Sequence, residues 1–131
     1  MQFSMIAKFA LLSLAASFAH GTPLASGEGQ LERRQSYSNA RMTWYNADGT
    51  GSCGNTVTNS EYIVALDSAL YDSGAHCGKS ITIEYDGKTA QATIADECPG
   101  CPSGGLDLTE SLFEHFASLD VGVIYGDWYY N

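Results

Sequence analysis

The residues of this chain that could do chemistry gather in one stretch, ADECPGCPSGGLDLT, at positions 95–109. It holds two carboxylates, Asp96 and Asp107, with a Cys-Pro-Gly-Cys element between them. A pair of carboxylates can cleave a glycosidic bond at about 5–5.5 Å in retaining enzymes and roughly 6.5–9.5 Å in inverting ones. Because the connection is short and rich in glycine, it could bring Asp96 and Asp107 together, and we treat them as a candidate site.

Both aspartates also have structural interpretations. The sequence Asp107-Leu-Thr-Glu110 fits a capping box at a helix start, in which the Asp carboxylate accepts backbone N–H groups and Glu110 reaches back. Such a cap would hold Asp107 ionised, which does not suit a general acid. Asp96 could equally be a turn residue that accepts backbone donors. We predict that Asp107 is a helix cap that also faces a ligand groove, with Asp96 across from it.

The four cysteines favour disulfides over a metal site. They are Cys53, Cys77, Cys98 and Cys101, and all of them follow residue 35. An even number of cysteines in an exported chain is typical of disulfides, and four cysteines can pair in three ways. The spacing of Cys98 and Cys101 matches half of a zinc site, but a second CxxC pair is missing. A redox role would need a thioredoxin-like context that the sequence does not show. We predict two disulfides, no metal and no cofactor.

The first residues indicate export. Residues 1–19 place Lys8 before an apolar run, as in a signal peptide. Residues 20–34 contain three glycines, show no apolar periodicity and end in two arginines, which is typical of a propeptide with a dibasic cleavage site. No later apolar run approaches the roughly 20 residues of a membrane helix. We expect a secreted monomer, with one domain over residues 35–131 and no membrane partner.

The predicted domain is strongly acidic. Three of the six Lys and Arg residues and two of the fifteen Asp and Glu residues precede residue 35, which leaves three cations against thirteen acids. Nucleic acid and anionic membranes are therefore excluded as expected partners. Acidic wall polymers such as pectin are disfavoured by the same repulsion, whereas neutral glucans and chitin are not.

Short strands dominate the pattern of the domain. Residues 80–85 alternate between apolar and polar, and Asp86-Gly87 separates them from a second such run over 88–95, which predicts a hairpin. From Asp107 the apolar residues fall at helical spacing, which predicts one short helix to about Ser118. Several short strands with one helix near the C-terminal end are typical of a small β-barrel.

Four elements, in their order and spacing, resemble the double-psi β-barrel superfamily, which includes barwin, expansin first domains, rare-lipoprotein-A-like proteins and family-45 glycoside hydrolases. The elements are Thr43-Trp-Tyr45 before the loop with Cys53-Gly54, Cys77-Gly78-Lys79, Ala95-Asp-Glu-Cys-Pro-Gly-Cys101, and Gly105-Leu-Asp-Leu-Thr109. The resemblance covers residues 41–130 and is greatest to small secreted fungal proteins that consist of this barrel alone. It implies a mainly β fold, a six-stranded double-psi β-barrel with one or two short helices, stapled by the disulfides Cys53–Cys77 and Cys98–Cys101.

The resemblance also implies a surface groove for polysaccharide. Its substrate-binding residues would be Thr43, Tyr45, Asp96 and Asp107. Asp107 would be the catalytic residue of any activity, but the family's hydrolases place a general-base aspartate where this chain has Asn46 and Ala47. We therefore expect a non-hydrolytic, expansin-like or barwin-like protein that associates with neutral cell-wall polysaccharide, glucan or chitin. Two alternatives stay open: a protease inhibitor or effector that binds a protein through exposed loops, and a lytic or hydrolytic enzyme that cleaves a glycan.

Overall fold

The computed structural model describes residues 35–131. The signal peptide predicted for residues 1–19 and the propeptide predicted for 20–34 lie outside the described residues. Across residues 35–131, no helix is long and apolar enough to cross a membrane.

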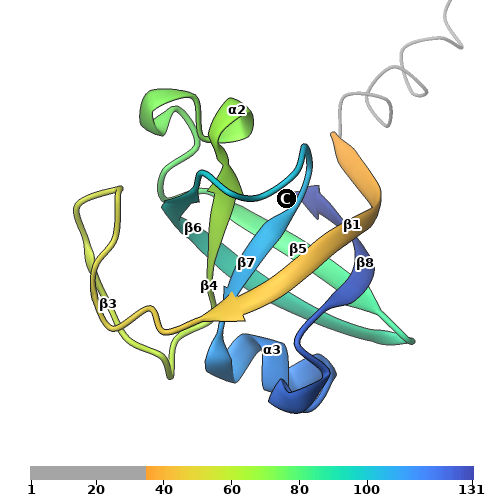
Figure 1. The fold of residues 1–131 in the computed structure, drawn as a ribbon. Coiled ribbons are helices and arrows are strands. Elements are labelled where there is room, and N and C mark those ends of the chain that lie inside the picture. The colour runs from red at the N-terminus through yellow and green to blue at the C-terminus, as the bar shows by residue number, and fades with distance from the viewer. Residues whose placement is uncertain (1–34) are drawn as a thin grey trace, which may run out of the picture.

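Six strands close into a barrel in the order β1-β7-β4-β6-β5-β8 (Figure 1). They are β1 (Ser36–Tyr45), β4 (Ile63–Asp67), β5 (Ser80–Tyr85), β6 (Lys88–Cys98), β7 (Leu106–Thr109) and β8 (Ile124–Tyr130). The pairs β1–β7 and β4–β6 are parallel and the other neighbours are antiparallel. The predicted six-stranded, mainly β barrel is therefore confirmed.

Short elements surround the barrel. A two-stranded sheet of β2 (Gly49–Thr50) and β3 (Thr56–Val57) projects from one side of it (Figure 1). The helices are α2 (Ser68–Tyr71) and α3 (Glu110–Phe116), and the 3-10 turns are η1 (Asp72–Gly74) and η2 (Leu119–Val121). Helix α3 covers the end of the barrel opposite to α2 (Figure 1).

The predicted hairpin is formed by β5 and β6. Its turn residues, Asp86 and Gly87, both have positive φ, at 48° and 76°. A two-residue turn with positive φ at both positions matches the twist of antiparallel strands, which explains the Asp-Gly sequence. Strand β6 extends to Cys98, beyond the predicted end at residue 95, because its last residues pair in parallel with β4.

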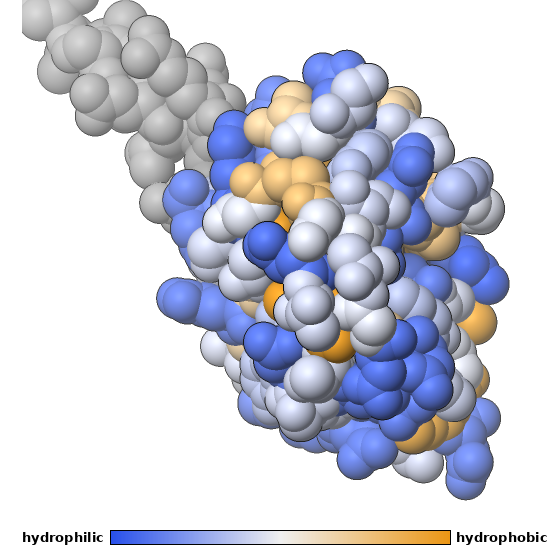
Figure 2. Space-filling model, turned by 90° about the vertical axis from the view of Figure 1, so that its left-hand side faces the viewer, coloured by the Kyte–Doolittle hydropathy of each residue, from blue (hydrophilic) through white to orange (hydrophobic). Residues whose placement is uncertain are grey.

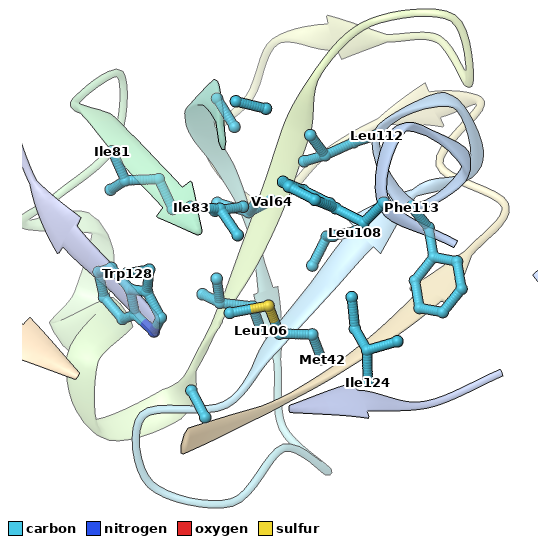
Figure 3. Close-up of a cluster of buried hydrophobic side chains, with 14 of the residues drawn as sticks. Met42, Val64, Ile81, Ile83, Leu106, Leu108, Leu112, Phe113, Ile124 and Trp128 are labelled. Atoms are coloured by element: carbon cyan, nitrogen blue, oxygen red, sulfur yellow. The ribbon is translucent and has the colours of Figure 1, made fainter. Parts of the chain in front are cut away.

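Alternate residues of the strands fill the barrel with aliphatic side chains and one tryptophan (Figure 3). The fully buried members are Met42, Val64, Leu66, Ile81, Ile83, Ile94, Leu106, Leu108, Leu112, Phe113 and Trp128. Leu112 and Phe113 come from α3, so the helix closes one end of the same core. The indole N–H of Trp128 donates to the Gly104 carbonyl at 2.8 Å, which satisfies the buried polar group.

The helix near the C-terminal end begins later than the sequence predicts, and Asp107 is not its cap. Asp107 lies in β7, and the N-cap of α3 is Thr109, whose side chain makes no capping bond. Asp107 pairs with Thr43 on one side and with Ala65 on the other, so strand pairing outweighs the local capping pattern. The prediction of a capping box at Asp107 is therefore wrong.

Two disulfides staple the domain, and residues 35–131 contain no free cysteine. They join Cys53 to Cys77 and Cys98 to Cys101, the pairing that the resemblance implied. The first disulfide ties the loop after β2 to the segment before β5, and the backbone N–H of Cys53 donates to the Ala95 carbonyl of β6 at 3.1 Å.

Candidate functional site

The predicted site residues occupy one row across four neighbouring strands. In register, Thr43 of β1 pairs with Asp107 of β7, Asp107 with Ala65 of β4, and Ala65 with Asp96 of β6. Paired residues point to the same side of a sheet, and the neighbouring Met42 points into the core, so this row faces outward. Asp107 and Asp96 are two strands apart, about 9.5 Å between Cα atoms. We call Thr43, Asp107, Ala65 and Asp96 the acidic row.

A β-bulge places Asp96 in the acidic row. Val64 pairs with Ile94 but Ala65 pairs with Asp96, so Ala95 is an extra residue on β6. Without the bulge, Ala95 would oppose Ala65, since a shift of one residue exchanges the two faces of a strand. Ala95 packs instead into a small cluster outside the barrel, with Ala47, Val57 and Ile63.

Asp107 has an environment that favours its protonated form. Burial is the main cause that raises the pKa of its carboxyl group, and the charge of Asp96 raises it further. The Thr43 hydroxyl, which donates to Asp107 Oδ1 at 2.9 Å, acts against this, as do the charge of Arg41 and the backbone amide of Leu108. The net pKa is raised, so Asp107 can donate a hydrogen bond to a ligand at a higher pH than an ordinary aspartate.

Asp96 is held ionised by donors on both of its oxygens. Oδ1 accepts the backbone N–H and the hydroxyl of Ser52, both at 2.8 Å, and the N–H of Glu97 at 2.9 Å, while Oδ2 accepts the Tyr45 hydroxyl at 2.9 Å. Burial alone would raise the pKa of Asp96, but these hydrogen bonds outweigh it and lower the pKa. Three donors share Oδ1 and one reaches Oδ2, which keeps an acceptor position. Asp96 therefore anchors Tyr45 and Ser52, and its lowered pKa makes it a weak base toward a water molecule.

Tyr45 is positioned from both ends of its side chain. Its ring packs against the small cluster that includes Ala95, and its hydroxyl donates to Asp96. Burial and this hydrogen bond both raise the pKa of the phenol, which keeps it protonated as a donor. The half-buried ring leaves part of its edge on the same outer face as Thr43, two residues earlier on β1.

Asn46, at the position where the resemblance places a general base in the hydrolases, and the nearby Asp48 close a loop instead. Asn46 Oδ1 accepts the backbone N–H of Asp48 at 3.1 Å and the side-chain amide of Asn59 at 3.0 Å. The carboxylate of Asp48 accepts the backbone N–H of Asn59 at 2.8 Å. Asn46 and Asp48 are therefore engaged in holding the chain between β1 and β3.

Two residues of the site were missed from the sequence. Ser52 supplies two of the donors to Asp96. Its loop can come this close to β6 because Gly51 has no side chain, and a Cβ atom at that position would overlap the Ala95 carbonyl oxygen. Arg41 lies close enough to Asp107 for its charge to lower the carboxyl pKa. The alternation of β1 could have indicated Arg41, since it lies two residues before Thr43 and shares its face.

A third missed residue, Asp67, supports the loop that leads into β7. Its Oδ1 accepts the N–H groups of Ala69 and Leu70 at 3.0 and 3.1 Å, which caps α2. Its Oδ2 accepts the N–H of Gly104 at 2.9 Å. The signal was present, because an aspartate that follows an apolar strand and precedes a helical turn is a typical N-cap.

We expect Asp96→Asn to flatten the acid side of the stability profile. The folded-state pKa of Asp96 lies below its ordinary value, so its contribution to stability is complete above that value and is lost as the pH falls through the folded-state pKa. The free energy of unfolding, measured by urea denaturation from about pH 6 to about pH 2, should converge for wild type and variant in acid. Asp107 acts in the opposite sense, and its pKa depends on the charge of Asp96, so the same comparison is made in an Asp107→Asn background. A difference that stays constant with pH would contradict the prediction.

Comparison with known proteins assigns the family. No protein-family model matches the chain. The papain inhibitor of Streptomyces mobaraensis is 31% identical over 127 residues, which cover 91% of this chain and 88% of the inhibitor. The solved structure of a mutant Clavibacter michiganensis expansin in complex with cellohexaose aligns with a TM-score of 0.68 and 26% identity, over 74% of this chain and 50% of that chain. The chain belongs to the double-psi β-barrel family.

Within this double-psi β-barrel family the chain is expansin-like and Asp f 7-like. It is 36% identical to Allergen Asp f 7 of Aspergillus fumigatus over 119 residues, or 89% of this chain. It spans 42% of the length of that allergen, less than half. The family assignment confirms the resemblance inferred from the four sequence elements.

The side of the barrel from which β2 and β3 project has a mostly hydrophilic surface, with hydrophobic residues in small separate patches (Figure 2). A ligand on this side would therefore meet chiefly polar groups. Among residues 35–131, no group of three or more His, Cys, Asp and Glu is placed to hold a metal ion.

Proposed function

We propose that this double-psi β-barrel protein is secreted and associates with neutral cell-wall polysaccharide through the acidic row, without hydrolysing it. The observation that carries the proposal is the alignment of Thr43, Asp107 and Asp96 on one outer face, with Tyr45 bonded to Asp96. The expansin relative, whose solved structure contains cellohexaose, gives the proposal a precedent within the family.

The chemistry of the acidic row suits sugar hydroxyl groups. Thr43 fixes one oxygen of Asp107, and the remaining capacity of this carboxyl group can donate to or accept from a hydroxyl. Tyr45 adds part of an aromatic ring beside it, and aromatic rings present an apolar face to sugars. The excess of acids over cations in the domain repels polyanions, so a neutral glucan or chitin fits better than an acidic polymer.

The same contacts argue against hydrolysis. The pKa of Asp107 is shifted upward, which is the direction that favours a general acid. Its partner would have to be an ionised carboxylate that activates water, but the oxygens of Asp96 are engaged by four donors. Asp48 is likewise engaged by the amide of Asn59. An acid without an available base can bind a glycan without cleaving it by the two-carboxylate route.

We expect Asp107→Asn to reduce sedimentation of the protein with insoluble chitin and β-glucan. Asparagine keeps the shape and one acceptor for Thr43, but an amide group that can only donate replaces the second oxygen, which could accept from a sugar hydroxyl. One lost hydrogen bond to a ligand lowers affinity about fivefold or more. Asp120→Asn, a matched change at an exposed position in η2, should sediment like wild type.

Two results would contradict the proposal. If the wild-type protein stays in the supernatant with every polymer tested, polysaccharide is not its partner. Soluble reducing ends or anhydro-sugars that disappear with Asp107→Asn would establish cleavage, and the protein would then be a glycan-degrading enzyme.

A second candidate function, inhibition of a cysteine protease, is favoured by a separate observation. The papain inhibitor matches this chain over 88% of the inhibitor's own length, so the two proteins share nearly the whole inhibitor domain. Titration of papain with the purified protein tests this function directly. Inhibition by wild type, with no protein in the polysaccharide pellets, would replace the carbohydrate proposal.

A further inference from the structure

A surface hollow of about 460 Å³ lies on the outer side of the barrel where β8, β1 and the loop before β7 meet. It is lined by residues 36–41 of β1, by Pro102, Ser103 and Gly104, and by Tyr125 of β8. Its volume falls within the range of roughly 300–1,000 Å³ that is usual for sites of small ligands.

The backbone of β1 shapes this hollow. The pairing of β1 with β8 shifts between Tyr37 and Ala40, and Asn39 has a φ of 52°. Such an irregularity bends a strand and interrupts its hydrogen bonds to the neighbouring strand, so the outer surface of β1 is not flat at this point. The carboxylate of Asp127 accepts the N–H of Asn39 at 2.8 Å and fixes the bend.

The hollow is continuous with the acidic row through Arg41. Arg41 pairs with Tyr125 across β1 and β8, and it shares the outer face of β1 with Thr43, two residues further along. Its charge reaches Asp107, since it lowers the pKa of that carboxyl group. Asp107, Arg41 and Tyr125 therefore lie on the same outer side of three neighbouring strands, β7, β1 and β8.

Tyr125 gives this surface an exposed aromatic ring. With 56% of its area accessible, it is among the few large hydrophobic residues of 35–131 that are exposed. Arg41 and Ser103 lie around the same hollow. A ring face bordered by hydrogen-bonding groups matches a sugar ring, which offers an apolar face and equatorial hydroxyls.

We propose that Tyr125 and Arg41 form a second sugar subsite, in which Tyr125 stacks on a ring of the neutral glycan that Asp107 holds and Arg41 donates to its hydroxyls. The inference rests on the proposed function and extends it along the chain of the ligand. Asp107 and Tyr125 are two strands and two residues apart, about 12 Å by strand geometry. A single sugar ring does not span this interval, so the subsite contributes only to the binding of longer oligosaccharides.

The test is a titration with cellobiose and cellohexaose, and with chitobiose and chitohexaose, against wild type and variants. Wild type should bind the longer member of the matching pair more tightly. Tyr125→Ala should lose about fivefold or more in affinity for the longer ligand and leave the shorter one nearly unchanged, while Tyr125→Phe keeps the ring and the affinity. Tyr62→Ala is the matched control, because Tyr62 is another exposed tyrosine, 39% accessible, whose ring lies 5.9 Å from that of His115.

The outcomes separate the subsite from the function on which it rests. Binding that Asp107→Asn weakens and Tyr125→Ala does not would overturn the subsite and leave the acidic row as the binding site. Absence of binding by wild type to every oligosaccharide and polymer would overturn both. Unchanged sugar binding with weaker papain inhibition in Tyr125→Ala would show that the hollow contacts a protein instead.

Discussion

Replacing Cys53 and Cys77 together by serine is expected to lower the free energy of unfolding by about 3 kcal/mol or more. This disulfide joins residues 24 positions apart, so its removal releases a long loop in the unfolded chain. A domain of this size has a thin core and a total stability of about 5–10 kcal/mol, so the loss is a large fraction of it. Urea denaturation followed by tryptophan fluorescence measures the change.

The matched control is the pair Cys98→Ser and Cys101→Ser. Their sequence separation is 3, and closing so short a loop stabilises by about 2 kcal/mol or less in the same treatment. A loss from the control as large as that from the Cys53–Cys77 pair would refute the loop-closure explanation. Ser52 adjoins Cys53 and donates hydrogen bonds to Asp96. Loss of the Cys53–Cys77 disulfide should therefore also weaken polysaccharide binding, and loss of the Cys98–Cys101 disulfide should weaken it less.

Asp67→Ala is expected to be the other strongly destabilising change, by about 3 kcal/mol or more. Asp67 is 3% exposed, and alanine would leave the N–H groups of Ala69, Leu70 and Gly104 without their acceptor. An N-cap contributes about 1 kcal/mol, and each buried amide left unpaired costs about 1–3 kcal/mol. Urea denaturation at neutral pH gives the loss.

Asp67→Asn separates the effects of the two oxygens. Asparagine can keep an oxygen for Ala69 and Leu70, but its amide cannot accept from Gly104. We expect a smaller loss than with alanine. Equal losses from the two substitutions would mean that the charge of Asp67, and not the number of its bonds, stabilises the fold. Asp120→Ala, at an exposed position in η2 that does not have a positive φ, should have little effect.

Local signals predicted the parts of the fold that depend on neighbouring residues. The β5–β6 hairpin follows from alternation on both sides of Asp86-Gly87, and its turn has the expected backbone conformation. The predicted start of the helix was wrong because the prediction used local signals alone. The capping pattern at Asp107 is local, whereas its two strand partners, Thr43 and Ala65, are far away in the sequence.

The arrangement of the site needed information that is not local. The bond between Tyr45 and Asp96 joins residues 51 positions apart, and that between Thr43 and Asp107 joins residues 64 apart. The resemblance to a known family grouped these four residues, but spacing alone would not have done so. The bulge at Ala95, which decides the face on which Asp96 lies, left no recognisable mark in the sequence.

The pairing of the first and last strands has a consequence for how the protein is made. Ser36 lies opposite Tyr129, and Gln35 accepts a hydrogen bond from the backbone of Tyr130, so the seam of the barrel joins the two ends of the domain. Contacts between such distant positions form late and slowly, because a long loop must be ordered first. During synthesis, the edge of β1 that pairs with β8 therefore stays open until β8 has left the ribosome. Chaperones that shield strand edges would have most to do in that interval.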